Sequence, residues 1–267
     1  SIPLLLSLIP STFAQPATLK KFLDAYGDWM ACDFSPEIID SFLSTQNVGL
    51  QTRKHYRAAI HQLFQHAVIL NAATENPVAK AMKIRVKTDE PGILKPAQVA
   101  ALLSHADNDT LPGLAISFFA GVRRAEIERL DWSEIDIKGG LIEIKAAKAK
   151  TAQRRFIAMS ENLKAWLAPH ASPGGKVTPS HAIWRKGQKK ARLDAGIADW
   201  PHNAGRHSFA SYHLAMNEDP GKLAMELGHP DPRLLFSRYR TLVSKKSAAS
   251  FWNITPTAGE ITNIRTA

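Results

Sequence analysis

Apolar residues recur at helical intervals along the first third of the chain. Three such stretches predict helices at residues 16–30, 36–43 and 52–70. Asn76-Pro77 ends the third pattern, and we expect a short helix to follow it up to about Met82. The other side of the third stretch begins with Arg53, Lys54 and Arg57. The pattern therefore predicts a small helical bundle with a basic face.

The segment after this bundle has the composition of a linker. Residues 83–95 are charged and contain Pro91-Gly92, a dipeptide typical of turns. We place the linker at residues 87–95, between an N-terminal helical domain (1–86) and a second domain (96–255), with residues 256–267 as a C-terminal tail.

The second domain has a helical pattern with one interruption. Helical spacing or capping signals predict helices that start at Pro96 and near Leu111, cover residues 161–167, 180–195, 204–216 and 220–228, and start again at Pro232. Residues 141–144 and 155–159 alternate between apolar and polar types instead, which predicts two paired strands. The predicted fold class is mainly α with a small antiparallel β-sheet.

Composition and charge narrow the class of partner. The chain has 267 residues, of which 45% are hydrophobic and 22% charged, as in globular proteins. Lys and Arg number 34 against 24 Asp and Glu, and this formal net charge of +10 favours a polyanion. An anionic membrane surface is the other candidate, but no long basic amphipathic stretch supports it, and the apolar residues 1–10 are too few to span a bilayer.

Cysteine usage indicates the redox compartment. Cys32 is the one cysteine, which excludes an intramolecular disulfide and a cysteine-based zinc site. A reducing cytoplasm is the simple inference.

The polar residues at the ends of the expected elements form a chemically coherent set. They are cationic or imidazole groups followed by one tyrosine: Arg123, Lys150, His202, Arg206, His229 and Tyr239. Arginines can neutralise the oxygens of a phosphodiester in its transition state. A lysine can protonate a leaving alkoxide, a histidine can accept the phenolic proton or brace the phosphate, and the phenol can act as nucleophile. This chemistry needs no metal ion or other cofactor.

This set resembles the catalytic residues of the tyrosine recombinase (phage integrase) family. Residues 119–132 (FAGVRRAEIERLDW) look like the family's first box, which makes Arg123 the first catalytic arginine and Glu126 its supporting acid. Residues 206–211 (RHSFAS) look like the second box and give Arg206 as the second arginine. Residues 227–229 (LGH), followed by Tyr239, look like the third, which implies Tyr239 as the nucleophile.

A lysine between the two strands completes the resemblance. Lys150 is similar to the lysine that the family carries in this hairpin, although Lys145 and Lys148 lie close by in the sequence. The resemblance implies that Lys150 is the general acid.

The second box departs from the family pattern. The family usually has His or Lys three residues before the second arginine, where this chain has Asn203, and His202 lies four residues before. Gly205 also replaces an aliphatic residue. We expect either His202 or Asn203 to contact the phosphate, and we interpret His207 as a supporting histidine in the core or behind the catalytic groups.

The resemblance implies a core-binding domain and a catalytic domain that clamp double-stranded DNA. It also implies site-specific recombination through a 3′-phosphotyrosyl intermediate, with a homotetramer assembled on two DNA sites. The basic residues that we expect to contact DNA are Arg53, Lys54, Arg57, Arg124, Arg185, Lys186 and Lys189. Two alternatives stay open: an enzyme like the type IB topoisomerases, and a DNA-binding relic with weakened catalysis.

Overall fold

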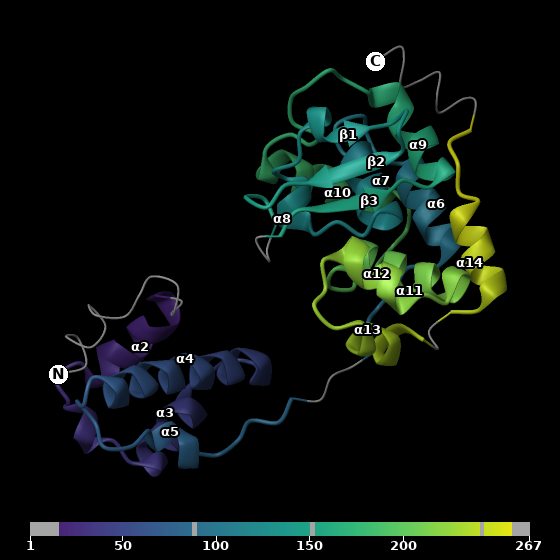
Figure 1. Cartoon of the computed structure of the whole chain (residues 1–267). Coiled ribbons are helices and arrows are strands. Elements are labelled where there is room, and N and C mark those ends of the chain that lie inside the picture. Colours follow the sequence, from purple (N-terminus) through teal and green to yellow (C-terminus); the bar gives the residue numbers. More distant parts are fainter. Residues whose placement is uncertain (1–15, 87–89, 150–152, 241–242, 258–267) are drawn as a thin grey trace. The chain divides into compact units, whose positions relative to one another are not determined.

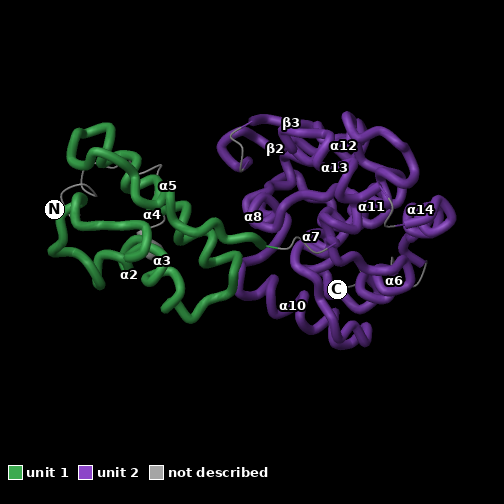
Figure 2. Tube along the Cα trace, turned by 90° about the horizontal axis from the view of Figure 1, so that it is seen from below, with its two compact units in different colours: residues 1–89 green, residues 90–267 purple. Residues whose placement is uncertain are grey.

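In a computed structural model, the chain divides into two compact units, residues 1–89 and 90–267 (Figure 2). The structure describes residues 16–86, 90–149, 153–240 and 243–257. Lys150, the apolar N-terminus and most of the predicted C-terminal tail lie outside these ranges. None of the helices within them is long and apolar enough to cross a membrane.

The first unit is a helical bundle around an aromatic centre. Its helices are α2 (Pro16–Tyr26), η1 (Ala31–Asp33), α3 (Pro36–Thr45), α4 (Leu50–Ile69) and α5 (Pro77–Lys80) (Figure 1). The ring of Phe22 lies 5.1–6.2 Å from those of Phe34, Phe42 and Phe64. The pairs with Phe42 and Phe64 are edge-to-face, an arrangement that stabilises a core beyond the area that it buries.

The prediction of one helix over residues 16–30 was wrong at its end. Helix α2 stops at Tyr26, directly before Gly27, and Trp29 and Met30 are exposed. The carboxylate of Asp33 accepts a hydrogen bond from the backbone N–H of Met30 at 2.8 Å, which starts η1 in a new direction. Glycine disfavours continuation of the helix, and this local cap replaces it.

The second unit is helical with one small sheet. Its longer helices are α6 (Pro96–Ser104), α7 (Leu111–Phe119), α9 (Glu161–Leu167), α10 (His181–Asp194), α11 (Ala204–Asn217), α12 (Pro220–Leu227), α13 (Pro232–Tyr239) and α14 (Lys245–Trp252). Short turns of helix form α8 (Arg124–Ile127), η2 (Trp132–Glu134) and η3 (Ala168–His170). The predicted fold class is confirmed.

The sheet has three antiparallel strands in the order β1 (Ile135–Asp136), β2 (Leu141–Ile144) and β3 (Arg155–Ala158). Ile144 pairs with Arg155 and Leu141 with Ala158, so the hairpin register is fixed on both sides of the lysine-rich connection. The sequence missed β1, because two residues are too few to show alternation.

Helix α7 forms the centre of the second unit, and α11 packs against it and against α14 (Figure 1). A Cβ at Gly205 would collide with the hydroxyl and the Cβ of Ser117 and would lie unusually close to its backbone carbonyl carbon. The absence of a side chain at Gly205 therefore allows α11 to pack closely against α7. This explains why no aliphatic residue occupies this position. Tyr212 stacks on Phe251 at 4.1 Å and fixes α14, a helix that the sequence did not predict.

Candidate active site

Three arginines contact the carboxyl end of α12. Helix α12 ends at Leu227 and is capped by Gly228, whose φ of 58° is the left-handed conformation that glycine accommodates. The last carbonyls of a helix have no partner inside it and carry partial negative charge. Here three successive carbonyls accept guanidinium N–H groups: Glu226 O from Arg155 Nε (2.9 Å), Leu227 O from Arg206 Nη2 (2.7 Å) and Gly228 O from Arg123 Nη2 (3.3 Å).

Glu126 holds two of these arginines from the other side. Its carboxylate is 1% exposed and pairs with Arg155 Nη2 at 2.6 Å and with Arg123 Nη1 at 3.1 Å. Burial alone would raise the pKa of Glu126, but the hydrogen bond and charge of Arg155, helped by Arg123, lower it to about 2. The carboxylate is therefore ionised at any pH near neutral, as a supporting acid requires.

Arg155 is the member of this cluster that the sequence analysis did not identify as a site residue. It lies at the start of β3, where the alternate residues 155 and 157 point inward. A charged residue on the buried side of a strand needs a partner. An arginine at an inward-facing position of a predicted strand was therefore the signal available in the sequence.

Arg206 enters the site from the first turns of α11. Its Nη1 donates to Gly121 O at 2.8 Å, in addition to the bond with α12. Burial, and then the charge of Arg123, lower the pKa of Arg206 to about 9, so the guanidinium stays protonated at neutral pH. Three guanidiniums thus face one carboxylate, and the cluster has an excess of two positive charges that suits an anion.

Tyr239 is the last residue of α13 and is 5% exposed. Its hydroxyl lies 2.6 Å from Nδ1 of His207 on α11. Burial raises the pKa of Tyr239, against the opposing charges of Arg238 and Arg206. Burial, followed by Arg238 and Arg206, lowers the pKa of His207 to about 4. The phenol is therefore protonated and the imidazole neutral at pH 7.

The remaining predicted histidines lie at the edge of this cluster. His202 and Asn203 are both exposed just before α11, and Asn203 occupies the cap position with a φ of 55°. Nδ1 of His229 lies 3.0 Å from Asp231 O, which orients its ring. His229 also borders a groove of about 950 Å³ that Arg155, Phe156 and Gly228 help to line.

The hairpin lysines that the structure describes are paired with a buried acid. Glu134, whose side chain is 1% exposed, pairs with Lys148 Nζ at 2.6 Å and with Lys145 Nζ at 3.2 Å. Both ammonium groups are therefore fixed at the base of the hairpin.

The residues predicted to contact DNA fall into two groups. Arg57 donates to the carbonyls of Val78, Ala81 and Met82 at 2.6–3.2 Å, and Arg53 donates to Gln46 O at 3.1 Å. These two side chains stabilise the first unit itself. The others are exposed and cationic: Lys54, Arg124, Arg185, Lys186 and Lys189.

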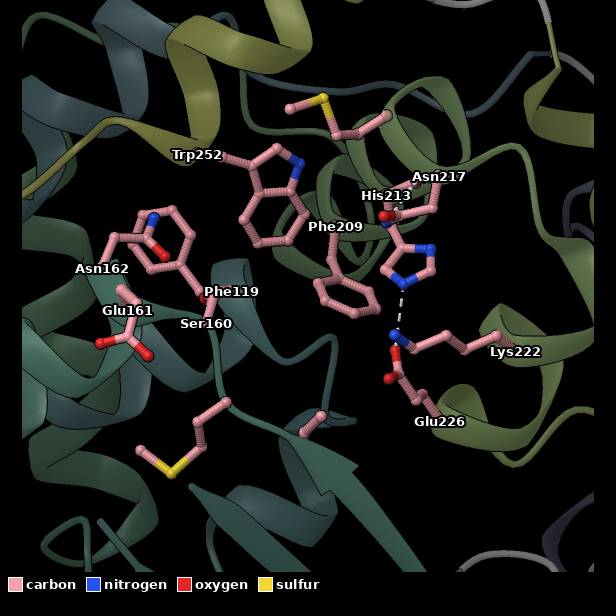
Figure 3. Close-up of a pocket in the computed structure, with 13 residues that line it drawn as sticks. Phe119, Ser160, Glu161, Asn162, Phe209, His213, Asn217, Lys222, Glu226 and Trp252 are labelled. Carbon is pink, nitrogen blue, oxygen red and sulfur yellow. Dashed lines mark hydrogen bonds and ion pairs between the residues drawn. The ribbon is translucent and has the colours of Figure 1, made fainter. Parts of the chain in front are cut away.

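A second pocket, of about 350 Å³, has walls formed by Phe119, Phe209 and Trp252 (Figure 3). In it the carboxylate of Glu226 pairs with Nε2 of His213 at 3.3 Å. The backbone carbonyl of Glu226 also accepts a hydrogen bond from Arg155. Glu226 therefore lines this pocket and contacts the arginine cluster. Within the described residues, no group of three or more His, Cys, Asp or Glu side chains is arranged to hold a metal ion.

Two tyrosine recombinases align with most of this chain. XerD, a tyrosine recombinase of Vibrio cholerae, is 25% identical over 218 residues, which cover 72% of this chain and 70% of XerD. XerC, a tyrosine recombinase of Chromohalobacter salexigens, is 27% identical over 253 residues, which cover 82% of this chain and 84% of XerC.

Solved structures share the fold. A lambda integrase dimer bound to a core site superimposes with a TM-score of 0.67 at 15% identity, over 84% of this chain and 86% of that one. The XerH recombinase bound to its palindromic difH substrate gives 0.65 at 19% identity, over 88% and 78%. The model of the phage integrase family matches residues 93–246, more than half of the sequence. The chain therefore belongs to the phage integrase family of tyrosine recombinases.

Proposed function

We propose that this chain cleaves and rejoins duplex DNA at specific sites through a 3′-phosphotyrosyl intermediate on Tyr239. The observation that carries the proposal is a buried phenol on which the charge of Arg206 acts, and Arg206 shares the end of α12 with Arg123, which Glu126 holds. Arg206 and Tyr239 are close enough for the charge of Arg206 to act on the pKa of the phenol. A phosphodiester is the substrate that such a cationic cluster can bind and such a phenol can attack.

In the proposed reaction, Arg123 and Arg206 neutralise the non-bridging oxygens as charge develops on them. The phenolic oxygen of Tyr239 forms a bond to phosphorus, and the bond from phosphorus to the 5′ oxygen breaks. Lys150 protonates that oxygen, an assignment supported by the pairing of Lys145 and Lys148 with Glu134. His229, and His202 or Asn203, supply further phosphate contacts.

A 5′-hydroxyl from a second duplex then reverses the step. The phosphodiester energy is conserved in the tyrosyl bond, so the reaction needs no metal or nucleotide cofactor. We infer that the partner is double-stranded DNA, held in part by the exposed cations of α10, and that four protomers assemble on two sites. A lambda integrase tetramer bound to a Holliday junction, with a TM-score of 0.60 to this chain, supports that assembly.

The test is a covalent trap. Duplexes enriched from a random pool for binding to this chain are nicked in one strand, so that a short fragment diffuses away after cleavage and the adduct persists. We expect wild-type protein to form an adduct that resists SDS, with or without EDTA. Tyr239→Phe should bind the same duplex and form none. Tyr56→Phe, which removes a hydroxyl in the first unit, should react like wild type.

The alternatives give different results in the same experiment. A shift of the duplex on a gel by both wild type and Tyr239→Phe, with no adduct from either, would favour the DNA-binding relic. Adduct formation together with relaxation of supercoiled DNA, but without exchange between two duplexes, would favour the topoisomerase-like enzyme.

A further inference from the structure

The phenol of Tyr239 and the imidazole of His207 meet where α13 packs against α11. Their rings lie 5.8 Å apart at an angle of 41°, and Nδ1 approaches the phenolic oxygen to 2.6 Å. His207 follows Asn203 by one helical turn, and its backbone N–H donates to Asn203 O at 2.9 Å. Positions 203 and 207 therefore lie on the same side of α11.

The other ionisable groups that act on this pair are Arg206, Arg238 and, on the imidazole, His202. The two guanidiniums are donors only and cannot accept a proton. The carboxylate of Glu126 is already held by Arg155 and Arg123. Asn203 carries an amide, which has no basic nitrogen. Among the residues that the structure describes, His207 is thus the ionisable group in contact with the phenol that has a nitrogen lone pair to accept its proton.

The protonation states fit a transfer from phenol to imidazole. Burial and the nearby arginines keep the pKa of His207 at about 4, so that its ring is neutral and can expose a lone pair at Nδ1 with the proton on Nε2. Burial raises the pKa of Tyr239, so the phenol keeps its proton until a base removes it. A bound phosphodiester would bring negative charge near Arg206, which favours the imidazolium during the reaction.

We propose that His207 is a catalytic residue that accepts the phenolic proton of Tyr239 at Nδ1 as the phenolic oxygen attacks phosphorus. The inference rests on the proposed function. In cleavage, the bond from Tyr239 to phosphorus forms, the bond to the 5′ oxygen breaks, and the phenolic proton moves to His207 while the general acid protonates the 5′ oxygen. In rejoining, the 5′ oxygen bonds to phosphorus and its proton passes to the deprotonated general acid, while the bond from phosphorus to Tyr239 breaks and His207 returns its proton to the phenolic oxygen.

The first test uses His207→Asn, because the asparagine amide can occupy the place of Nδ1 without being able to accept a proton. Single-turnover cleavage of the nicked duplex is measured from pH 3.5 to 9, a range that includes the pKa of His207 of about 4, with binding measured separately at each pH. We expect His207→Asn to bind the duplex and to cleave about 10²- to 10⁴-fold more slowly. The fall in wild-type rate at low pH should disappear in the variant. His105→Gln, in an exposed position at the end of α6, should cleave like wild type.

The second test separates a proton acceptor from a proton donor. A duplex with sulfur in place of the 5′ bridging oxygen has a leaving group that departs without protonation. His207→Asn should remain slow on this duplex, whereas a general-acid variant should recover. In His207→Ala, free imidazole should restore at least about 10-fold of the lost rate, in proportion to its unprotonated fraction.

Several results would contradict the role of His207 or the proposed function itself. Cleavage by His207→Asn within about 3-fold of wild type, or recovery of this variant on the sulfur duplex, would overturn the proposal. Loss of DNA binding in both His207 variants would give His207 a structural role and would also overturn it. If His202→Gln alone removes the low-pH fall, His202 is the base. An absence of adduct in wild type would refute the proposed function itself, a result distinct from all of these.

Discussion

Removal of the charge on Glu126 should destabilise the second unit strongly. In Glu126→Gln, the shape of the side chain is kept, but Arg155 and Arg123 lose the carboxylate that balances them. Arg155 is buried and cannot regain water in exchange. Deletion of one partner of a buried ion pair leaves an uncompensated charge, and this cost is typically about 3–5 kcal/mol.

The shift in pKa gives an independent magnitude. The pKa of Glu126 falls from its ordinary value of 4.5 to about 2, which at ~1.4 kcal/mol per pKa unit corresponds to about 3 kcal/mol of unfolding free energy. Because the folded-state pKa is depressed, this contribution is present above pH 4.5 and is lost as the pH falls toward 2. At pH 3, roughly half of it should remain.

Urea unfolding monitored by tryptophan fluorescence can measure this effect in the full chain. Five of the six tryptophans lie after residue 90, so a Trp29→Phe background makes the signal report the second unit alone. The matched control is Glu218→Gln, which removes a carboxylate that pairs with Lys245 at 2.7 Å but is 68% exposed. Exposed pairs of this kind contribute little to stability, because water and salt screen them.

We expect Glu126→Gln to lose about 3 kcal/mol at pH 7 and about half as much at pH 3, with little change in Glu218→Gln. A loss below about 1 kcal/mol at pH 7, or one that does not shrink between pH 7 and pH 3, would refute the reasoning. The first result would mean that water or another group compensates the arginines. The second would mean that Glu126 acts through shape rather than charge.

Three further changes test other parts of the structure. Gly205→Ala should destabilise the second unit by about 1–3 kcal/mol in the same urea assay, because the new methyl group collides with Ser117 where α11 meets α7. Lys148→Met should keep adduct formation within about 10-fold of wild type, whereas Lys150→Met should lose 10²-fold or more; equal losses on the nicked duplex would contradict the assignment of the general acid. Arg57→Met should lower the melting temperature of the first unit through the loss of three hydrogen bonds to backbone carbonyls, each contributing about 1 kcal/mol, and a Lys54→Met control should leave it unchanged.

Local signals predicted most of the helix starts. Ser35, Asp219 and Asp231 each precede a proline that begins a helix, and each side chain accepts a hydrogen bond from the first turn that follows. Such signals succeed because a cap and its helix lie within four residues of each other. Helix α14 escaped prediction because only Ala248 and Phe251 of it are buried, too few to produce a clear apolar period.

The sequence by itself determined the family, the mainly helical fold class, and the identity of Arg123, Glu126, Arg206 and Tyr239 as candidates for one site. Each of these follows from residue types at short, fixed spacings. The sequence did not predict which groups hold these side chains in place. Arg155 forms hydrogen bonds with Glu126, 29 residues away in the sequence, and with Glu226, 71 residues away. Arg123 forms one with Gly228, 105 residues away.

The tertiary structure decided which polar groups are partners. It shows that Arg57, which we predicted to contact DNA, donates a hydrogen bond to a backbone carbonyl of α5, and that His207 lies beside the phenol of Tyr239. The physical reason is that hydrogen-bond acceptors at the end of a helix, and the burial that fixes a pKa, arise only when distant segments pack together. Spacing along a chain encodes neighbours within a helix or hairpin, and the packing of α11, α12 and α13 supplies the remainder.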